Sequence, residues 1–502
     1  MTSLRYKLLF TVILLSLSFG CDDYLGENVD PNKELPANVT APDLLPSAIV
    51  NTSSAHYSIA FSMCLYSQQL ASYFEPGADT HEEVQLSGGW ESIFLEAFSQ
   101  LDQIASIAEE TGDNAYLGIA KVLQAQNLGL ATDQWGAVPF STATLGEEDF
   151  TPSFDSQETV YTEINTLLDD AISLLGQASG GIGQEDLIFG GDISKWQKTA
   201  HFLKAKYALH LSEVDQDAAV NGVLANVANG FGSNEDDFQL VYNTRNFNPW
   251  HAGVVLPNAT GNASVLLSDQ LVSTMNGTAF PFTTIDLDPR LPRITTVGED
   301  ATEYRGGING SAGVHRFATD QGADSVNISA NTDFGADNFY SSQTAPIILG
   351  SYAEQKFMEA EALFLQNGGN ATSVGTTQAA YDAYLEGIRA NMEKLGVAAG
   401  ESAAYLAEAS VDVGAPNLTL KLIMREKNIA IFLNPESFVD LRRYDFSTDV
   451  FEGLELPVNH NPLLNGQWVR RAQYPASEQT RNGAEVEKVT QDIGTGVWWD
   501  RD

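Results

Sequence analysis

Basic residues are scarce in this chain. Lysine and arginine together number 26 against 66 aspartates and glutamates, so the 502 residues carry a formal net charge of −40. A surface this acidic repels nucleic acid and other polyanions at long range, which argues against a DNA- or RNA-binding function. The imbalance is typical of adaptation to salty water. It also favours a neutral glycan or a peptide over a strongly anionic polysaccharide as a ligand.

The chain also lacks the common signatures of catalysis and of metal binding. We find no Gly-x-Ser-x-Gly, no His-Glu-x-x-His, no Cys-x-x-Cys and no phosphate-binding glycine loop. No calcium loop of the EF-hand type is present either, so we predict no catalytic residues, no metal and no cofactor. A carboxylate pair of the glycosidase kind cannot be read from a sequence this acidic. A glycan-degrading enzyme therefore stays an alternative, as does a helical-repeat scaffold that binds proteins.

Cysteine is almost absent, with two residues, Cys21 and Cys64. A secreted protein that relies on disulfides normally carries an even set, and if Cys21 is acylated only one thiol remains. Cys64 lies in the apolar stretch IAFSMCLY. It is predicted to be a buried small hydrophobic residue.

A single long apolar run stands at the N-terminus. LLFTVILLSL, residues 8–17, follows the basic residues Arg5 and Lys7. Its ten or so residues fall short of the roughly 20 that a membrane-spanning helix needs. The run fits the apolar region of a secretory signal.

The signal ends in LSFGC, which resembles a bacterial lipobox although Ser18 stands where leucine is usual. We predict a signal peptide over 1–20, lipid attachment at Cys21 and an acidic tether over 21–40. The protein would then be held at the membrane by its N-terminal lipid alone. The alternative is an ordinary signal peptide, with Cys21 left as a plain thiol.

Helical periodicity dominates much of the remaining chain. SKWQKTAHFLKAKYALHLS places apolar residues on one helix face, with Ser194 as the expected N-cap: Trp196, Ala200, Leu203, Tyr207 and Leu211. In SYAEQKFMEAEALFLQ, small and aromatic residues alternate on one face, so neighbouring helices can approach closely, while Glu354, Glu359 and Glu361 mostly point elsewhere.

Consecutive helices are predicted to pair. The pairs are 92–111 with 114–134 and 157–177 with 194–212. A further pair is predicted in the stretch LTLKLIMREKNIAIFL followed by PESFVDLRRY. The first helix has Leu418, Leu422, Ile429 and Leu433 on one stripe. Asn434, just before the second, is its expected N-cap. Such pairs predict an all-α, tetratricopeptide-like superhelix.

Loop signals interrupt this pattern. Glycine, asparagine, threonine and proline are frequent over 231–344 and again over 446–502. We predict one domain over 41–502, with a helical scaffold at 41–230 and 345–445, an irregular insert at 231–344 and an irregular C-terminal segment. Long irregular segments inside a compact domain usually have a function.

Several motifs together resemble one family. VLQAQNLGLATDQWGAVPFSTA resembles the helix-and-loop signature of SusD/RagB-like outer-membrane lipoproteins of Bacteroidetes. Further matches follow in order along the chain: DDYLGENVDPN, KWQKTAHFLKAKYALHLS, DPRLP, SYAEQKFMEAEALF, REKNIAIFLNPESFVDLRRYDF and the terminal VWWD. The terminal motif is nearer to the SusD-like type 2 branch.

The resemblance implies both a fold and a function. Members are all-α, with four tetratricopeptide-like pairs and irregular insertions that form a ligand site. They lie on the extracellular face of the outer membrane as the lid of a SusC-like TonB-dependent transporter. They capture oligosaccharides, or peptides in some branches, and catalyse nothing. We therefore expect a lipid-anchored nutrient-binding protein that delivers a neutral glycan to such a transporter, with a peptide as the alternative ligand.

Aromatic residues on loops are the candidate ligand contacts. In the family that this chain resembles, the loop after the first long helices contributes to the ligand site. The corresponding stretch here is SYFEPGADTHEEVQLSGGW, from which we select Tyr73, Glu75, Asp79 and Trp90. Flat apolar rings pack on sugar rings, and planar polar groups pair with hydroxyls.

Two stretches of the insert supply further candidates. NPWHAG offers Trp250 and His251, and YRGGINGSAG offers Tyr304 and Arg305, a guanidinium in a chain poor in basic residues. Trp468 is ambiguous between structure and site. Structural roles are expected for the other tryptophans: Trp135, Trp196, Trp498 and Trp499.

Overall fold

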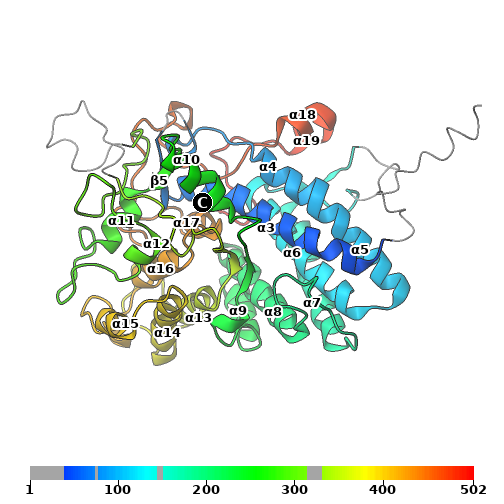
Figure 1. The fold of residues 1–502 in the computed structure, drawn as a ribbon, viewed down its shortest axis with the longest axis horizontal. Coiled ribbons are helices and arrows are strands. Elements are labelled where there is room, and N and C mark those ends of the chain that lie inside the picture. Colours follow the sequence, from blue (N-terminus) through cyan, green and yellow to red (C-terminus); the bar gives the residue numbers. More distant parts are fainter. Residues whose placement is uncertain (1–38, 74–76, 144–150, 314–330, 502) are drawn as a thin grey trace, which may run out of the picture.

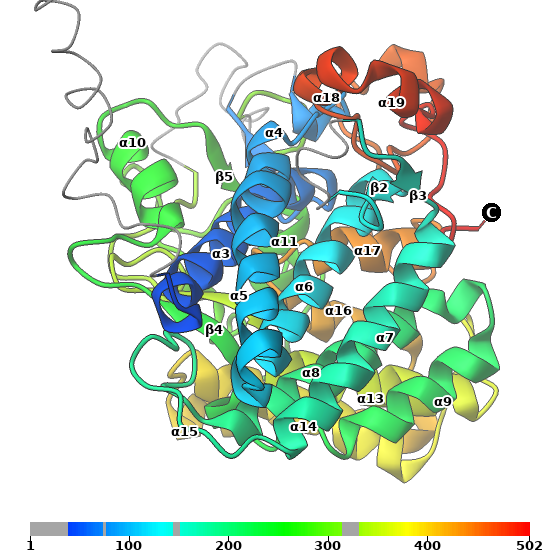
Figure 2. The ribbon, with the colours of Figure 1, turned by 90° about the vertical axis from the view of Figure 1, so that its right-hand side faces the viewer.

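The computed structural model describes residues 39–73, 77–143, 151–313 and 331–501. Figures 1 and 2 show that helices of the scaffold follow one another around the molecule, while short helices, strands and loops gather on another side. The predicted all-α fold with helical pairs and loop-rich insertions is confirmed.

The first long helix, α3 (Ala41–Tyr66), begins at a capping box. The backbone N–H of Thr40 donates to Asp43 Oδ2 at 2.9 Å. α3 packs against α5, α6 and α17, so it forms a central element of the core. Cys64 is fully buried near its end, as predicted.

Seven helices pack in chain order, each against the next. They are α5 (Phe98–Thr111), α6 (Asn114–Trp135), α7 (Gln157–Gly176), α8 (Ile193–His210), α9 (Gln216–Val227), α13 (Tyr352–Gln366) and α14 (Gln378–Lys394). The predicted pairs within 92–134 and 157–212 are therefore confirmed. A short helix, α4 (Ser87–Trp90), and a π-helical stretch, Glu91–Ala97, lead into α5.

Side-chain caps explain where most of these helices begin, because each cap accepts a hydrogen bond from an otherwise unpaired N–H group. The prediction that Ser194 caps α8 was wrong. Asp192 holds that position, and its Oδ1 accepts from the Ser194 N–H at 3.0 Å. The other caps are Asp113, Ser156, Asp215, Ser351 and Thr377.

Glycine allows helices to approach closely, as the small-and-aromatic pattern predicted. A Cβ on Gly129 of α6 would lie 2.2 Å from the ring of Tyr207 on α8. A Cβ on Gly387 of α14 would lie 2.8 Å from the ring of Phe357 on α13. No larger side chain fits at either position without displacing the neighbouring ring.

The two helices predicted near the C-terminal part of the scaffold are present, and the ion pair between Lys427 and Asp440 connects them. They are α16 (Leu420–Ala430) and α17 (Glu436–Arg443), preceded by α15 (Ala399–Leu406). Asn434 Oδ1 accepts from the Glu436 N–H at 3.0 Å, which is the expected capping contact.

Within the described residues there are three two-stranded antiparallel sheets, which the sequence did not predict, and two of them connect segments far apart in the chain. β4 (Phe238–Val241) pairs with β6 (Pro346–Gly350), so the chain enters and leaves the insert at the same place. β1 (Leu70–Ser72) pairs with β5 (Val265–Leu267), and β2 (Val138–Pro139) pairs with β3 (Phe154–Asp155).

Short helices complete the loop-rich parts. Those of the insert are α10 (Leu256–Ala259), α11 (Asp269–Met275) and α12 (Leu291–Ile294), with a π-helical turn at His251–Val255. The C-terminal segment carries α18 (Ala476–Arg481) and α19 (Gly483–Val489). Within the described ranges, no helix is both long and apolar enough to cross a bilayer.

Charged side chains are buried where the scaffold helices meet. Lys206 of α8 lies 2.8 Å from Glu354 and 3.3 Å from Glu436, and His210 lies 2.9 Å from Glu436 and 3.4 Å from Asp133. Of the three glutamates of α13 expected to point mostly away from its apolar face, Glu354 and Glu361 are buried and Glu359 is half-buried.

A second group of charges continues this network. Lys427 lies 2.8 Å from Asp440 and 3.6 Å from Glu361, and Arg443 lies 2.7 Å from each of the two carboxylates. We call the nine residues the ionic core: Asp133, Lys206, His210, Glu354, Glu361, Lys427, Glu436, Asp440 and Arg443. Their pairing makes burial tolerable, because an unpaired buried charge is costly.

Candidate functional site

Segments that are far apart in the sequence meet at one place, which we call the loop face. Its four parts are 70–73 with 77–82, 304–313, 331–333 and 455–468. Asp79 connects the first two, because its Oδ2 accepts from the N–H groups of Ser72 at 2.8 Å and Gly310 at 3.0 Å. Asn309 Nδ2 donates to Leu70 O at 2.7 Å. These buried hydrogen bonds fix the loops against β1.

The C-terminal segment closes the loop face. The N–H of Val458 donates to Asn309 O at 3.0 Å, and the N–H of Asn461 donates to Thr80 O at 2.9 Å. Asn461 Nδ2 also donates to His81 O at 3.2 Å. Residues about 380 positions apart in the chain are therefore held together, which no local sequence pattern indicates.

Four of the predicted ligand residues lie on this face. Tyr73 and Asp79 are buried, whereas Tyr304 and Arg305 are half-buried. The Arg305 N–H donates to Thr332 Oγ1 at 2.7 Å, which ties the second and third segments together. Burial raises the pKa of the Tyr73 hydroxyl above its usual range. Of these four side chains, Tyr304 and Arg305 are the ones that reach solvent.

Trp90 does not belong to the loop face. Its side chain is 2% exposed. Its ring lies 4.4 Å from that of Phe94, 5.0 Å from that of Trp135 and 6.1 Å from that of Tyr474. The structure thus gives Trp90 a packing role and leaves no open ring face for a sugar.

Trp250 and His251 are likewise enclosed. The Trp250 ring stacks on Phe61 at 6.0 Å and on Phe334 at 6.1 Å, and its side chain is 2% exposed. His251 Nδ1 lies 2.9 Å from Ser341 O. Ligand contact by these residues stays a prediction that burial does not favour. Cys21 and Glu75, the other two predicted sites, lie outside the described residues.

Trp468, which the sequence left ambiguous, lies on the loop face and is half-buried. One side of its ring stacks on Phe446, with 4.7 Å between centroids and 2° between planes. Its centroid also lies 5.2 Å from that of His81. Burial, together with the neighbouring His460, lowers the pKa of His81 to about 3, so this aromatic group is neutral at physiological pH.

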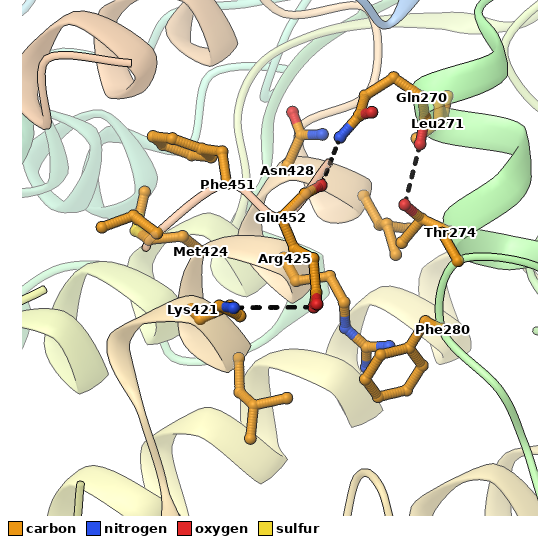
Figure 3. Close-up of a pocket in the computed structure, with 14 residues that line it drawn as sticks. Gln270, Leu271, Thr274, Phe280, Lys421, Met424, Arg425, Asn428, Phe451 and Glu452 are labelled. Atoms are coloured by element: carbon orange, nitrogen blue, oxygen red, sulfur yellow. Dashed lines mark hydrogen bonds and ion pairs between the residues drawn. The ribbon is translucent and has the colours of Figure 1, made fainter. Parts of the chain in front are cut away.

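A pocket adjoins the loop face, between α11, the loop around Phe280, α16 and residues 450–452 (Figure 3). We call it the interhelix pocket. It is small, with a cavity volume of about 70 Å³. Its walls are mainly apolar: Leu271, Ala279, Phe280, Leu422, Met424, Ile429, Val450 and Phe451. Asn276 Nδ2, at the end of α11, donates to Tyr304 O at 3.1 Å, so α11 borders both the pocket and the loop face.

The polar groups of the interhelix pocket are few. Gln270 Nε2 donates to Glu452 O at 2.8 Å, and Lys421 Nζ lies 3.8 Å from Glu452. Thr274 and Asn428 also line the space. Figure 3 shows Gln270 on one side of the pocket and Arg425 with Phe280 on another.

Arg425 is the most constrained of these groups. Its Nη2 donates to Glu426 Oε1 and, at 3.2 Å, to the Tyr405 hydroxyl, and its guanidinium lies 3.2 Å from the centre of the Phe280 ring. Burial lowers the pKa of Arg425, but the attraction of Glu426 outweighs this effect and the pKa lies above its usual value. Within the described residues, Nε and Nη1 are buried and make no hydrogen bond.

The loop that carries Phe280 is anchored by Glu408. Its carboxylate accepts from the N–H groups of Thr283 at 2.9 Å, Thr284 at 2.6 Å and Ile285 at 3.0 Å. Both threonine hydroxyls also donate to it. These hydrogen bonds outweigh desolvation and lower the pKa of Glu408 to about 2, so the anchor stays ionised at neutral pH.

Sequence reasoning missed the interhelix pocket. Leu422 and Ile429 were assigned to the packing stripe of a scaffold helix, although both line the pocket. A signal was present in the same helix: Lys421 and Arg425 stand one turn apart in a chain with few basic residues. Among the described residues, no cluster of three or more His, Cys, Asp or Glu side chains could hold a metal ion.

Comparison with known proteins identifies the family. A model of the second SusD-like type, described as "Starch-binding associating with outer membrane", matches residues 33–475. The chain belongs to this family. The SusD-like match covers the scaffold and all four segments of the loop face. No curated protein matches the chain.

Solved structures share the SusD-like fold. A chitin-binding protein is 20% identical, with a TM-score of 0.73, over 91% of this chain and 100% of that one. A SusD/RagB family protein from Bacteroides thetaiotaomicron is 22% identical, with a TM-score of 0.70, over 92% and 99%. A chitin-binding SusD homolog from Flavobacterium johnsoniae is 20% identical, with a TM-score of 0.69, over 91% and 99%.

Proposed function

We propose that this protein is a lipid-anchored, cell-surface binding protein that captures a neutral oligosaccharide and delivers it to a SusC-like TonB-dependent transporter. One observation carries the proposal: the matched family is described as starch-binding and outer-membrane-associated, and the match includes every segment of the loop face. Two structural neighbours are named as chitin-binding, so neutral β-linked glycans belong among the ligands to test.

The chemistry of the loop face supports glycan binding. Tyr304 and Trp468 offer half-buried aromatic rings, and a ring face can pack against the C–H face of a pyranose. Arg305 supplies planar N–H donors beside Tyr304, which suit the hydroxyl groups of a sugar. Trp468 is held by Phe446 from one side, so little side-chain entropy is lost when a ligand binds.

Two carboxylates of the loop face, those of Asp79 and Asp333, support binding rather than hydrolysis, because both accept hydrogen bonds that hold loops in place. Asp79 accepts two backbone hydrogen bonds, and Asp333 Oδ1 accepts from Asn258 Nδ2 and from the Phe334 N–H, each at 2.7 Å. Both acidic groups thus hold loops in place. We propose that the protein releases its glycan unchanged to the transporter.

Calorimetric titration tests this proposal. We expect binding of at least one soluble malto-, cello- or chito-oligosaccharide, and Trp468→Ala should weaken it about tenfold, since roughly 1.4 kcal/mol of binding free energy corresponds to a factor of ten. Trp498→Ala is the matched control, because Trp498 is also half-buried but packs near Tyr161 on the scaffold. Thermal unfolding verifies that both variants fold.

Two results would contradict the proposal. One is tight binding to peptides with no binding to any glycan. The other is steady release of new reducing ends from the bound glycan, which would identify an enzyme. The transporter part is tested separately: affinity-tagged protein should co-purify a TonB-dependent transporter from outer membranes.

A further inference from the structure

A small cavity lies inside the scaffold, next to the ionic core. Residues of α3, α6, α8 and α17 line it, together with Asn434 and Pro435, and every one of them is buried. Its volume is about 20 Å³. A water molecule needs roughly 10–15 Å³ of such space, so the cavity has room for one molecule of that size.

Three uncharged side chains on the walls of the cavity have polar atoms without partners. These atoms are both ring nitrogens of His56, Oε1 of Gln126, and both Nε2 and Oε1 of Gln134. The three residues are at most 4% exposed, and none of these atoms makes a hydrogen bond with another described residue. A buried polar atom without a partner is costly, so a partner inside the cavity would stabilise all three side chains.

The ligand of this cavity is expected to carry no charge. The charged residues on its walls, Asp133, Lys206 and Glu436, belong to the ionic core, where each has an oppositely charged partner at 3.4 Å or less. Burial, together with Lys206, lowers the pKa of His56 to about 3, so its ring is neutral at physiological pH. An ion would therefore add an unpaired charge to the interior, which is costly.

The polar atoms require a partner that both donates and accepts hydrogen bonds. A neutral imidazole has one N–H donor and one acceptor nitrogen, and a glutamine side chain has both kinds of group. Water is uncharged, has the required size and can make two to four hydrogen bonds in a protein interior. We propose that the cavity binds one ordered water molecule, which bridges His56 of α3 to Gln126 and Gln134 of α6.

This water molecule is a structural part of the scaffold. Ion pairs already connect α6 to α8 and α8 to α17 at the same place. The water adds an uncharged connection between α3 and α6, so the first long helix is joined to the ionic core by hydrogen bonds as well as by apolar packing. The inference does not depend on which ligand the loop face binds.

A high-resolution crystal structure tests the inference directly. We expect one ordered water molecule in the cavity, within hydrogen-bond distance of at least two of His56, Gln126 and Gln134. Direct hydrogen bonds among these side chains with no water between them would overturn the inference. An ion at the same position would overturn it as well.

Denaturant titration of variants measures whether the water couples the two helices. His56→Leu and Gln134→Met each remove polar groups that face the cavity and keep a side chain of similar size. These two residues make no direct hydrogen bond with each other, so coupling between them has to pass through the water. Once one substitution has removed part of its partners, the second should cost less. The double variant should therefore lose less stability than the sum of the two single losses.

Gln124→Met is the matched control for Gln134→Met. Gln124 is also a buried glutamine of α6, but its Nε2 donates to Asp102 Oδ1 at 2.7 Å and it does not line the cavity. Its loss of stability should simply add to that of His56→Leu. Additive losses for His56→Leu with Gln134→Met would overturn the bridging role of the water. If a variant does not fold, the crystal structure of the wild type decides.

Discussion

The ionic core and the interhelix pocket both contain paired charged side chains, but they differ in what surrounds the pairs. Both place charged side chains of the α16–α17 region away from solvent. Every charged group of the ionic core lies within 3.6 Å of an opposite charge. In the interhelix pocket the charges also pair, but the space beside them is not filled by side chains. Charge pairing in a filled interior supports the fold, whereas the pocket leaves apolar side chains uncovered beside paired charges.

The largest expected effect comes from breaking the ionic core. Lys427→Met removes the cation that lies between Asp440 and Glu361 and leaves buried carboxylates less well paired. We expect the free energy of unfolding to fall by about 3–5 kcal/mol in denaturant titration. Lys488→Met, which breaks the exposed pair with Glu485, is the control and should cost about 0.5 kcal/mol or less. Equal effects of the two substitutions would refute the assigned role of the core.

The pH dependence of stability sharpens the comparison. Burial lowers the pKa of His210, but Glu436 and Asp133 raise it more strongly, to about 9 in the folded protein against an ordinary value of 6.5. Protonated His210 therefore stabilises the fold below pH 6.5, and this contribution is lost as the pH rises to about 9. The loss is on the order of 3 kcal/mol.

Denaturant titrations at pH 6 and pH 9.5 measure this loss. His210→Gln should be less stable than the wild type at pH 6 and should show a smaller change between the two conditions. If the wild type and His210→Gln lose stability in parallel over this range, His210 is not the titrating group.

A smaller effect is expected at the wall of the interhelix pocket. Glu408→Gln replaces a carboxylate that accepts from three N–H groups and two hydroxyls with a side chain that has one acceptor oxygen. The loop that carries Phe280 should loosen, so the amide hydrogens of Thr283, Thr284 and Ile285 should exchange with solvent faster in hydrogen-exchange measurements. Affinity for a glycan bound at the loop face should stay the same. Unchanged exchange at these three residues would mean that Glu408 does not anchor the loop.

Periodicity in the sequence predicted the scaffold well. The stripe on α8 and the pairs within 92–134 and 157–212 are local patterns, and helices that bury one apolar face repeat every three to four residues. The cap of α8 was misplaced by two residues because both Asp192 and Ser194 are favourable cap residues.

The site was harder to predict because burial depends on distant residues. Trp90 and Trp250 stand beside glycine or proline, as exposed loop residues often do, yet rings far along the chain, such as those of Tyr474 and Phe334, enclose them. Leu422 and Ile429 carry the pattern of a packed helix face, and a cavity beside that face leaves no trace in the pattern. Tyr304 and Arg305 were selected on loop position and residue type, and the structure leaves both half-buried, so ligand contact by them stays a prediction.

The most direct test is a crystal structure of the protein with a bound chito-oligosaccharide. We predict sugar rings packed on Trp468 and Tyr304, with sugar hydroxyl groups within hydrogen-bond distance of Arg305. An oligosaccharide bound to the outer surface of the scaffold helices, away from the loop face, would contradict the account.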